Sequence, residues 1–249
     1  MSRRSLAPLS PRSREVDDAT AEAREESAQR EFVTNAAHEL QSPLTAIVSA
    51  IEVLQAGAKD TPDRDIFLGH IERASARLAR LARALLILAR VQTGAEAPRT
   101  ELVALQPLLS DIAAQLRPAE GVTVEVSCPP DVAAVTNREL IEQVLLNIAE
   151  NAAKYTGRGR IELAAEVSGG EAEVRVSDTG RGIPWEEQDR VFDRFFRGEG
   201  SGEAGSGLGL AIVLAAVEAI GGTVDLQSAP GEGTTVRVRL PLGASMVAQ

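Results

Sequence analysis

Apolar residues recur at steps of three and four along the first third of the chain, which predicts two long amphipathic helices. One apolar face is formed by Phe32, Ala36, Leu40, Leu44, Ile47, Ile51 and Leu54. Gly57 and Thr61-Pro62 then mark a helix stop and a new start. The second apolar face is formed by Ile71, Ala74, Leu78, Leu81, Leu85 and Leu88. Its steps of three and four alternate without a slip, which is the period of a left-handed coiled coil.

The two helices predict an antiparallel hairpin that spans residues 17–93. One hairpin has too little core to be stable alone, whereas two hairpins packed as a four-helix bundle bury both apolar faces. We therefore expect a homodimer. Residues 1–16 are rich in Ser, Pro and Arg without any period, and we expect them to form a disordered tail.

The pattern changes after a linker over residues 94–100. Shorter elements follow: helices over residues 107–116, 138–154 and 208–220, and strands over residues 122–126, 161–167, 172–177, 223–227 and 234–240. Helices mixed with short alternating strands are typical of an α+β fold. We predict an α/β two-layer sandwich over residues 101–243, with a short tail over residues 244–249.

Composition excludes several classes of protein. The chain has 249 residues, a formal net charge of −10 and only 3% aromatic residues. A nucleic-acid partner is not expected, because phosphate backbones need a basic face and single strands need stacking aromatics. The single cysteine, Cys128, can form neither an internal disulfide nor a thiolate zinc site. No apolar run is long enough to cross a bilayer, so we expect no membrane span and a cytoplasmic location.

The predicted helix over residues 138–154 carries a polar stripe of Asn147, Asn151 and Lys154. Steps of four and three place these side chains on one face. Asparagine oxygens suit a hard cation such as Mg²⁺, and a nearby lysine can neutralise phosphate charge. The stripe is equally well explained as the solvated face of an amphipathic helix. Asn137, just before this helix, is the expected N-cap.

Two glycine-rich segments follow. In Asp178-Thr179-Gly180-Arg181-Gly182-Ile183-Pro184, the carboxylate can accept from an exocyclic amine while bare backbone lies against a flat ring. In Gly205-Ser206-Gly207-Leu208-Gly209-Leu210, which opens a helix, backbone amides can approach phosphates. Taken singly, the first is also an ordinary turn and the second a helix-capping loop. The second segment lacks the Lys-Ser/Thr ending of a P-loop.

Together these segments resemble the GHKL (Bergerat) ATP-binding fold. Its N box, first glycine box, F box and second glycine box are similar to Leu145–Tyr155, Asp178–Pro184, Phe192–Arg197 and Gly205–Gly209. Their order and spacing are similar to those in the catalytic domain of bacterial sensor histidine kinases. With the helical hairpin, the resemblance covers nearly all of residues 17–243.

The resemblance implies a site for ATP and Mg²⁺. The residues implied to bind the nucleotide are Asn147, Asn151, Lys154, Tyr155, Asp178, Gly180, Gly182, Ile183, Gly205, Gly207, Leu208 and Gly209. Among them, Asn151 would ligate Mg²⁺ and Asp178 would accept from the adenine amine. Lys154 and Arg197 would offset phosphate charge during the reaction. Residues 185–204 would form a mobile lid that excludes water.

The first predicted helix contains a histidine that points away from the apolar face. At 100° per residue, His38 lies roughly 200° from Ala36 and Leu40. An exposed imidazole is largely neutral at cellular pH and can act as a nucleophile. A lone helix histidine is usually only a surface residue, and we interpret His70 in that way. Pro43 cannot donate a backbone hydrogen bond, so it should loosen the helix beside His38.

The segment Phe32–Thr45 also resembles the H box of the histidine-kinase dimerisation domain. The resemblance implies that His38 is the phosphoacceptor and Glu39 its acid/base partner. Gln41 and Ser42 stand where the family usually has Arg and Thr. Ser42 keeps the hydroxyl that orients a water for dephosphorylating the partner regulator, so phosphatase activity remains open.

The implied function is an ATP-dependent protein-histidine kinase that passes its phosphoryl group to an aspartate of a separate response regulator. It would be cytoplasmic, or the cytoplasmic part of a membrane-bound sensor. One alternative is a pseudokinase scaffold that dimerises and docks a regulator, which the intact Asn151, Asp178 and glycine boxes disfavour. Another is a different GHKL protein, such as a topoisomerase, a mismatch-repair subunit or an anti-sigma serine kinase, which the hairpin with His38 disfavours.

Overall fold

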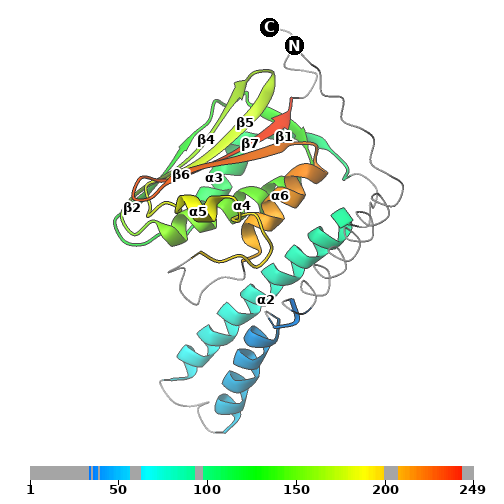
Figure 1. The fold of residues 1–249 in the computed structure, drawn as a ribbon. Coiled ribbons are helices and arrows are strands. Elements are labelled where there is room, and N and C mark those ends of the chain that lie inside the picture. The colour runs from blue at the N-terminus through cyan, green and yellow to red at the C-terminus, as the bar shows by residue number, and fades with distance from the viewer. Residues whose placement is uncertain are drawn as a thin grey trace, which may run out of the picture. The chain divides into compact units, whose positions relative to one another are not determined.

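The structure, a computed structural model, describes residues 34, 36–38, 40–56, 63–92, 98–198 and 207–242 (Figure 1). The chain divides into two compact units, Met1–Leu78 and Ala79–Gln249, and each is described by itself. Within the described ranges, no helix combines the length and apolar character that a bilayer crossing requires.

Two helical stretches carry the predicted apolar faces: residues 40–55 and helix α2 (Arg64–Gln92). The first continues through Pro43 without interruption. Ala36, on the predicted apolar face, is buried, and so is Ala50, which the prediction did not place on that face. Other apolar side chains on these helices stay 39–57% exposed, namely Leu44, Ile51, Ile66 and Leu86. The helices therefore form as predicted but leave much of their apolar surface open.

The second unit contains a five-stranded sheet with the strand order β2-β4-β5-β7-β6. Its strands are β2 (Val122–Ser127), β4 (Gly159–Ser168), β5 (Glu171–Asp178), β6 (Thr223–Ala229) and β7 (Gly233–Pro241). The β2–β4 pair is parallel, whereas the other neighbours are antiparallel. One face is covered by helices α3 (Leu105–Gln115), α4 (Arg138–Tyr155) and α6 (Gly209–Ala219) (Figure 1). The predicted α/β two-layer sandwich is confirmed.

The core lies between the sheet and these helices. Side chains alternate between the two faces of a strand, and in β5 it is Ala172, Val174 and Val176 that are buried. Helix α4 buries Ile141, Val144, Leu145, Ile148, Ala149 and Ala152. This packing orients α4 so that its polar stripe cannot turn into the core. At its start, the Asn137 side chain accepts from the Leu140 amide at 3.0 Å, which confirms the predicted N-cap.

Three short elements were not predicted. Strands β1 (Glu101–Ala104) and β3 (Ala133–Thr136) pair in a separate two-stranded antiparallel sheet, and helix α5 (Trp185–Gln188) makes about one turn. Four residues are too few for either periodicity to stand out. Helix α3 begins at Leu105 rather than at Pro107. A proline is tolerated within the first helical turn, because the amide that it lacks would have no hydrogen-bond partner in the helix there.

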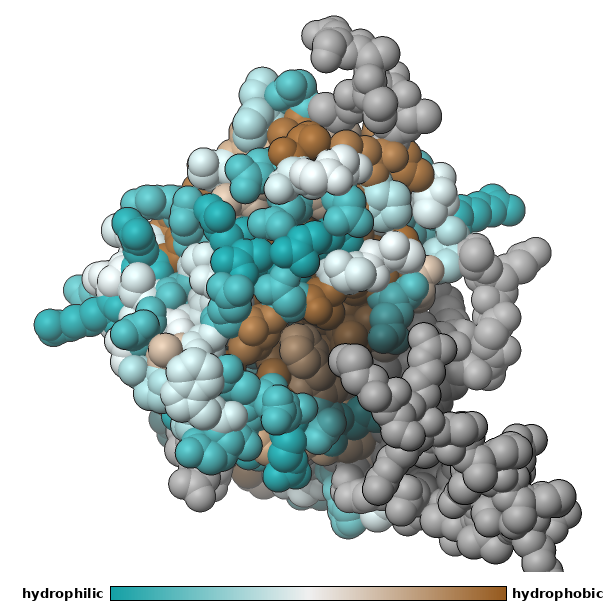
Figure 2. Space-filling view, turned by 45° about the horizontal axis from the view of Figure 1, so that its top comes forward, coloured by the Kyte–Doolittle hydropathy of each residue, from teal (hydrophilic) through white to brown (hydrophobic). Residues whose placement is uncertain are grey.

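Charged side chains form a network on the face of the sheet that the helices leave uncovered. Glu173 of β5 lies 3.8 Å from Arg237 and 3.0 Å from Arg239 of β7, and its side chain is only 12% exposed. Asp225 of β6 pairs with the same two arginines at 3.3 and 2.9 Å. Figure 2, which brings the upper side of Figure 1 forward, shows hydrophilic residues gathered across the middle of the molecule. The network ties three neighbouring strands together.

Removing the Glu173 carboxylate should destabilise this sheet, since it leaves two arginines sharing one anion. We expect Glu173→Ala to lower the free energy of unfolding by about 1 kcal/mol, near the upper end for surface ion pairs. Glu162→Ala is the matched control, because Glu162 is more exposed and lies 4.0 Å from its partner Arg175. Urea denaturation of both variants checks the prediction, and equal losses would contradict it.

Candidate functional site

The polar stripe of α4 lies against the start of α6. A Cβ placed on Gly209, the first residue of α6, would be 3.7 Å from the Asn151 Nδ2 and 3.9 Å from the Asn147 Oδ1. Two of the predicted nucleotide residues are thus brought beside one of the glycines of the second glycine segment. A methyl group at position 209 would therefore be in van der Waals contact with both amide groups.

One buried polar group at this place lacks a partner among the described residues, and it lies near a helix N-terminus. The Nδ2 of Asn147 is buried without a hydrogen bond. No side chain caps the start of α6, and Leu208 at the N-cap position is fully buried. The first amides of a helix have no partner within the helix and, with the helix dipole, favour an anion. The unpaired Asn147 amide and the N-terminal end of α6 therefore suit phosphate oxygens.

A cation at this place would depend on amide oxygens. In the part of the chain that the structure describes, no cluster of three or more His, Cys, Asp or Glu side chains could hold a metal ion. Mg²⁺ is usually held by one or two protein oxygens, with water and substrate phosphates completing its octahedron. The oxygens of Asn147 and Asn151 fit that ligand set.

The end of α4 gathers positive charge around one aromatic ring. The Lys154 Nζ donates to the Tyr155 hydroxyl at 2.9 Å and lies 4.6 Å from the centre of the ring. The Arg181 guanidinium lies 4.8 Å from the same ring. Cations within about 6 Å of an aromatic face are attracted to it. Tyr155 therefore holds two cationic side chains beside the site.

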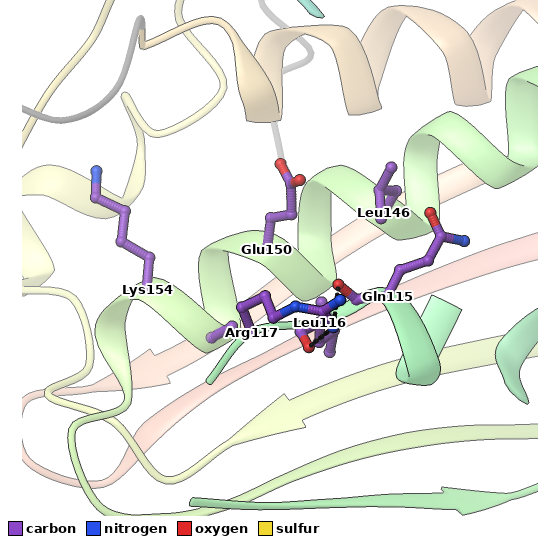
Figure 3. Close-up of a pocket in the computed structure, with 7 residues that line it drawn as sticks. Gln115, Leu116, Arg117, Leu146, Glu150 and Lys154 are labelled. Carbon is purple, nitrogen blue, oxygen red and sulfur yellow. Dashed lines mark hydrogen bonds between the residues drawn. The ribbon is translucent and has the colours of Figure 1, made fainter. Parts of the chain in front are cut away.

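A cavity of about 280 Å³ lies on the adjoining side of α4. It is lined by Gln115, Leu116, Arg117, Leu146, Glu150, Ala153 and Lys154 (Figure 3). The Arg117 guanidinium, which lines this cavity, donates to the carbonyls of Ala114, Gln115 and Leu116 at 3.0–3.4 Å. These hydrogen bonds cap the end of α3. The Arg117 cation is thus bonded to backbone carbonyls, and Lys154 is the lining residue that the cavity shares with the predicted phosphate site.

Asp178 ends β5 with its carboxyl group turned into a tight loop. Its Oδ1 accepts from the Gly180 amide at 2.8 Å. Burial raises the pKa of Asp178, while the amides of Gly180 and Thr234 and the hydroxyl of Thr156 act in the opposite direction. A Cβ on Gly180 would lie 2.5 Å from the Tyr155 carbonyl oxygen and 2.8 Å from the Asp178 Oδ1. Only glycine fits at this position.

The rest of this loop is fixed to the β6–β7 turn. The Gly231 amide donates to the Arg181 carbonyl at 2.8 Å, and the Ile183 amide donates to the Ser228 Oγ at 2.9 Å. The Gln188 Nε2 donates to the carbonyls of Ile183 and Ser228, each at 2.9 Å. Sequence reasoning missed Gln188 and Ser228, since single polar residues in a short helix and an edge strand give no periodic signal.

The F-box segment meets the second glycine segment through backbone contacts. The Phe195 amide donates to the Gly207 carbonyl at 2.9 Å. Phe195 has a φ of 63° and Gly207 a φ of 68°, and a Cβ on Gly207 would lie 2.6 Å from the Phe195 carbonyl carbon. Arg197 is exposed. Gly205, like Ser206, lies outside the described residues.

The predicted phosphoacceptor belongs to the first unit. His38 is helical and exposed, and so is Ser42 one turn further on. Glu39 lies outside the described residues. His70 in α2 is also exposed and lies edge-on to Phe67, with 6.2 Å between ring centres. Exposure is thus shared by both histidines and does not by itself distinguish them.

Two families match the chain. Residues 28–94 match HisKA, the His Kinase A (phospho-acceptor) domain. Residues 136–244 match HATPase_c, the histidine kinase-, DNA gyrase B-, and HSP90-like ATPase.

Curated relatives are similar across both regions. The sensor protein DivL of Caulobacter vibrioides is 36% identical over 231 residues, which cover 91% of this chain and 30% of DivL. The sensor-like histidine kinase SenX3 of Mycobacterium tuberculosis is 33% identical over 233 residues, which cover 91% of this chain and 57% of SenX3. The chain therefore spans between about a third and just over half of the length of these relatives.

Solved structures of similar proteins share the fold. Full-length ShkA in complex with AMPPNP is 27% identical with a TM-score of 0.63, covering 85% of this chain and 45% of ShkA. The mycobacterial sensor histidine kinase MprB is 31% identical with a TM-score of 0.50, covering 57% of this chain and 97% of the MprB chain.

Adding a methyl group at Gly182 should disrupt the loop, because its Cβ would collide with the Ala229 carbonyl and its φ is 67°. We expect Gly182→Ala to lower the free energy of unfolding by about 2–3 kcal/mol. Gly157→Ala is the control, since a Cβ there meets nothing within 4 Å, and it should be nearly neutral. Thermal denaturation distinguishes them, and equal stabilities would contradict the close packing of the loop.

The raised pKa of Asp178 has a consequence for stability. A carboxyl group with a raised pKa in the folded state favours folding while it is protonated, and that contribution is lost as the pH rises through the raised value. Asp178→Asn keeps an acceptor for the Gly180 amide without the charge, so we expect its Tm to exceed that of the wild type at pH 7 by about 2–4 °C.

The gain should shrink as the pH falls and disappear near the unfolded-state pKa of about 3.9, where the wild-type carboxyl is itself neutral. Melting curves of both proteins between pH 7 and pH 4 test this. A difference in Tm that is constant over this range would exclude the ionisation of Asp178 as its cause.

Proposed function

Because this chain belongs to the sensor histidine kinases, we propose that it transfers the γ-phosphoryl group of ATP to His38 and then to an aspartate of a response regulator. The observation that carries the proposal is the pairing of two half-sites in one unit. One is the carboxyl-and-glycine loop at Asp178, and the other is the unpaired Asn147 amide where α4 meets the N-terminal end of α6. A base with an exocyclic amine suits the first, and phosphates suit the second.

In this proposal, each predicted residue has one task. Asp178 accepts from the adenine amine, in a pocket left open by Gly180, Gly182 and Ile183. Lys154 and Tyr155 contact phosphate or ribose. The triphosphate is lined by Gly205, Gly207, Leu208 and Gly209, and the γ-phosphate is reached by Arg197. The ATP analogue in the ShkA structure supports a nucleotide as the ligand of this fold.

Mg²⁺ fits the amide oxygens of α4, with Asn151 as the ligand and Asn147 beside it. When bound, it would offset charge on the phosphate oxygens during transfer. The protein's own contribution is to fix those oxygens in position against the Asn147 amide and the N-terminal end of α6, so that little reorganisation is needed during the reaction.

The chemical step uses a neutral imidazole of His38. A ring nitrogen attacks the γ-phosphorus in line, a P–N bond forms, and the bond to the bridging β,γ-oxygen breaks so that ADP leaves with the electron pair. The imidazole then loses its ring proton to a base, the task we assign to Glu39. The phosphoryl group next moves from nitrogen to a carboxylate oxygen of the regulator. We assign to Ser42 the positioning of a water that attacks the phosphorylated aspartate of the regulator, which releases inorganic phosphate and restores the carboxylate.

We propose that the working form is a homodimer located in the cytoplasm, as a free protein or as the cytoplasmic part of a membrane-bound sensor. The HisKA domain implies dimerisation. The exposed apolar side chains of the helical hairpin, among them Leu44 and Ile66, support a second hairpin as the partner that covers them. The other partner is the receiver domain of the cognate regulator.

Replacing His38 should abolish self-labelling. Incubated with γ-labelled ATP and Mg²⁺, the wild-type chain should form a phosphoprotein that is labile in acid and stable in alkali, because the phosphoryl group is bonded to nitrogen. We expect His38→Gln to reduce the label at least 100-fold.

His70→Gln is the matched control, since His70 is the other histidine of the chain and is exposed as well. It should label like the wild type. Label that survives in His38→Gln, or label that is stable in acid, would overturn the assignment of His38. A chain that binds nucleotide but never labels would support the scaffold alternative.

A further inference from the structure

A buried hydroxyl without a partner lies at the C-terminal end of α4. Thr156 is the C-cap of this helix and is only 1% exposed. Its amide donates to the Ala152 carbonyl at 3.1 Å, but its Oγ1 has no hydrogen-bond partner in the structure. Threonine hydroxyls in helices commonly bond back to a carbonyl of the preceding turn. A buried hydroxyl that does not do so calls for an explanation.

The hydroxyl lies beside the carboxyl group of Asp178. The Tyr155 carbonyl carbon, to which Thr156 is bonded, and the Asp178 Oδ1 lie within 3.0 Å of one point, where a Cβ of Gly180 would stand. The Arg181 amide also donates to the Tyr155 carbonyl at 3.4 Å. The hydroxyl is near enough to act on the Asp178 pKa, yet outside hydrogen-bond geometry.

Asp178 needs such a donor to accept from a base. Its burial favours the neutral carboxyl, whose hydroxyl is a donor and whose carbonyl oxygen is a weaker acceptor for the exocyclic amine than a carboxylate oxygen. Three donors oppose this: the amides of Gly180 and Thr234 and the hydroxyl of Thr156. No charged side chain in the described part of the chain adds to that balance. Thr156 is therefore the only side chain among the groups that keep Asp178 an acceptor.

We propose that Thr156 is a positioning residue for base recognition, whose hydroxyl donates to the Asp178 carboxylate and holds it toward the exocyclic amine of the bound purine. The inference rests on the proposed function, in which Asp178 binds that amine. It adds that the preference of the site for an amino-purine depends on a hydroxyl that does not itself touch the base.

The test compares two ligands that differ only in that amine: ADP and purine riboside 5′-diphosphate, titrated with Mg²⁺ by calorimetry. We expect Thr156→Val to weaken ADP about tenfold, which is about 1.4 kcal/mol, and to leave the amine-free ligand within about twofold. Thr156→Ser keeps the hydroxyl and should restore ADP binding to within about twofold. Combining Thr156→Val with Asp178→Asn should cost no more than Asp178→Asn alone, as expected for two residues that act through one contact.

Thr136→Val is the matched control, because Thr136 is another fully buried threonine whose hydroxyl has no partner in the structure. It ends β3 in the separate two-stranded sheet, and it should leave both affinities unchanged. Should Thr156→Val fail to fold by circular dichroism, Thr156→Ala removes the same hydroxyl with less steric demand.

Equal weakening of both ligands by the hydroxyl-free variants, or a serine variant that behaves like valine, would overturn the inference, since either result points to packing. Unchanged ADP affinity in Thr156→Val would do the same. If the wild type binds neither ligand, the proposed function fails and takes the inference with it. If the wild type binds both ligands equally, Asp178 does not accept from the amine, and the inference fails together with that one residue assignment while the proposed phosphoryl transfer still stands.

Discussion

The candidate site depends on places where backbone lies directly against backbone. At the end of β5, the Gly180 position lies against the Tyr155 carbonyl, and the Gly182 position lies against the Ala229 carbonyl. At the start of α6, the Gly207 position lies against the backbone of Phe195. Glycine alone allows such approach, because any side chain would occupy the contact itself. The loops are therefore held in place by their neighbours' carbonyls and amides, and the side chains around them are left to face a ligand.

Helix α4 joins this arrangement to the core. Its apolar side chains pack on the sheet, and the same rotation of the helix presents Asn147 and Asn151 to α6 and Lys154 to Tyr155. The polar stripe had two explanations from sequence alone, a solvated face or a ligand site. The burial of the Asn147 amide without a partner favours the second, since a solvated face would leave that group in water.

The architecture of the second unit follows from periodicity, so the two-layer sandwich, helix α4 and the Asn137 cap were all predictable from sequence. The shared face of Asn147 and Asn151 also follows from helical spacing, whereas their meeting with Gly209 was implied only by the resemblance to the GHKL fold. The hydrogen bond from the Gln188 side chain to the Ser228 carbonyl could not be predicted from the sequence, because it joins residues 40 positions apart through one side-chain amide. The role of Thr156 could not be predicted from sequence either. It is indicated by the absence of a hydrogen bond to its hydroxyl, and no sequence pattern shows this.

The parallel pairing of β2 with β4 places α4 in the connection between two strands of the same sheet. In a sheet whose other neighbours are antiparallel, this pair requires a crossover, and α4 lies within the connection between the two strands. The helix is tethered at both ends, so it cannot fray away from the sheet as a terminal helix does. Opening it exposes the core of the whole unit. The side chains on α4 that would hold phosphate therefore lose their positions only when the whole unit unfolds. We expect the backbone amides of α4 to exchange their hydrogens with solvent slowly for the same reason.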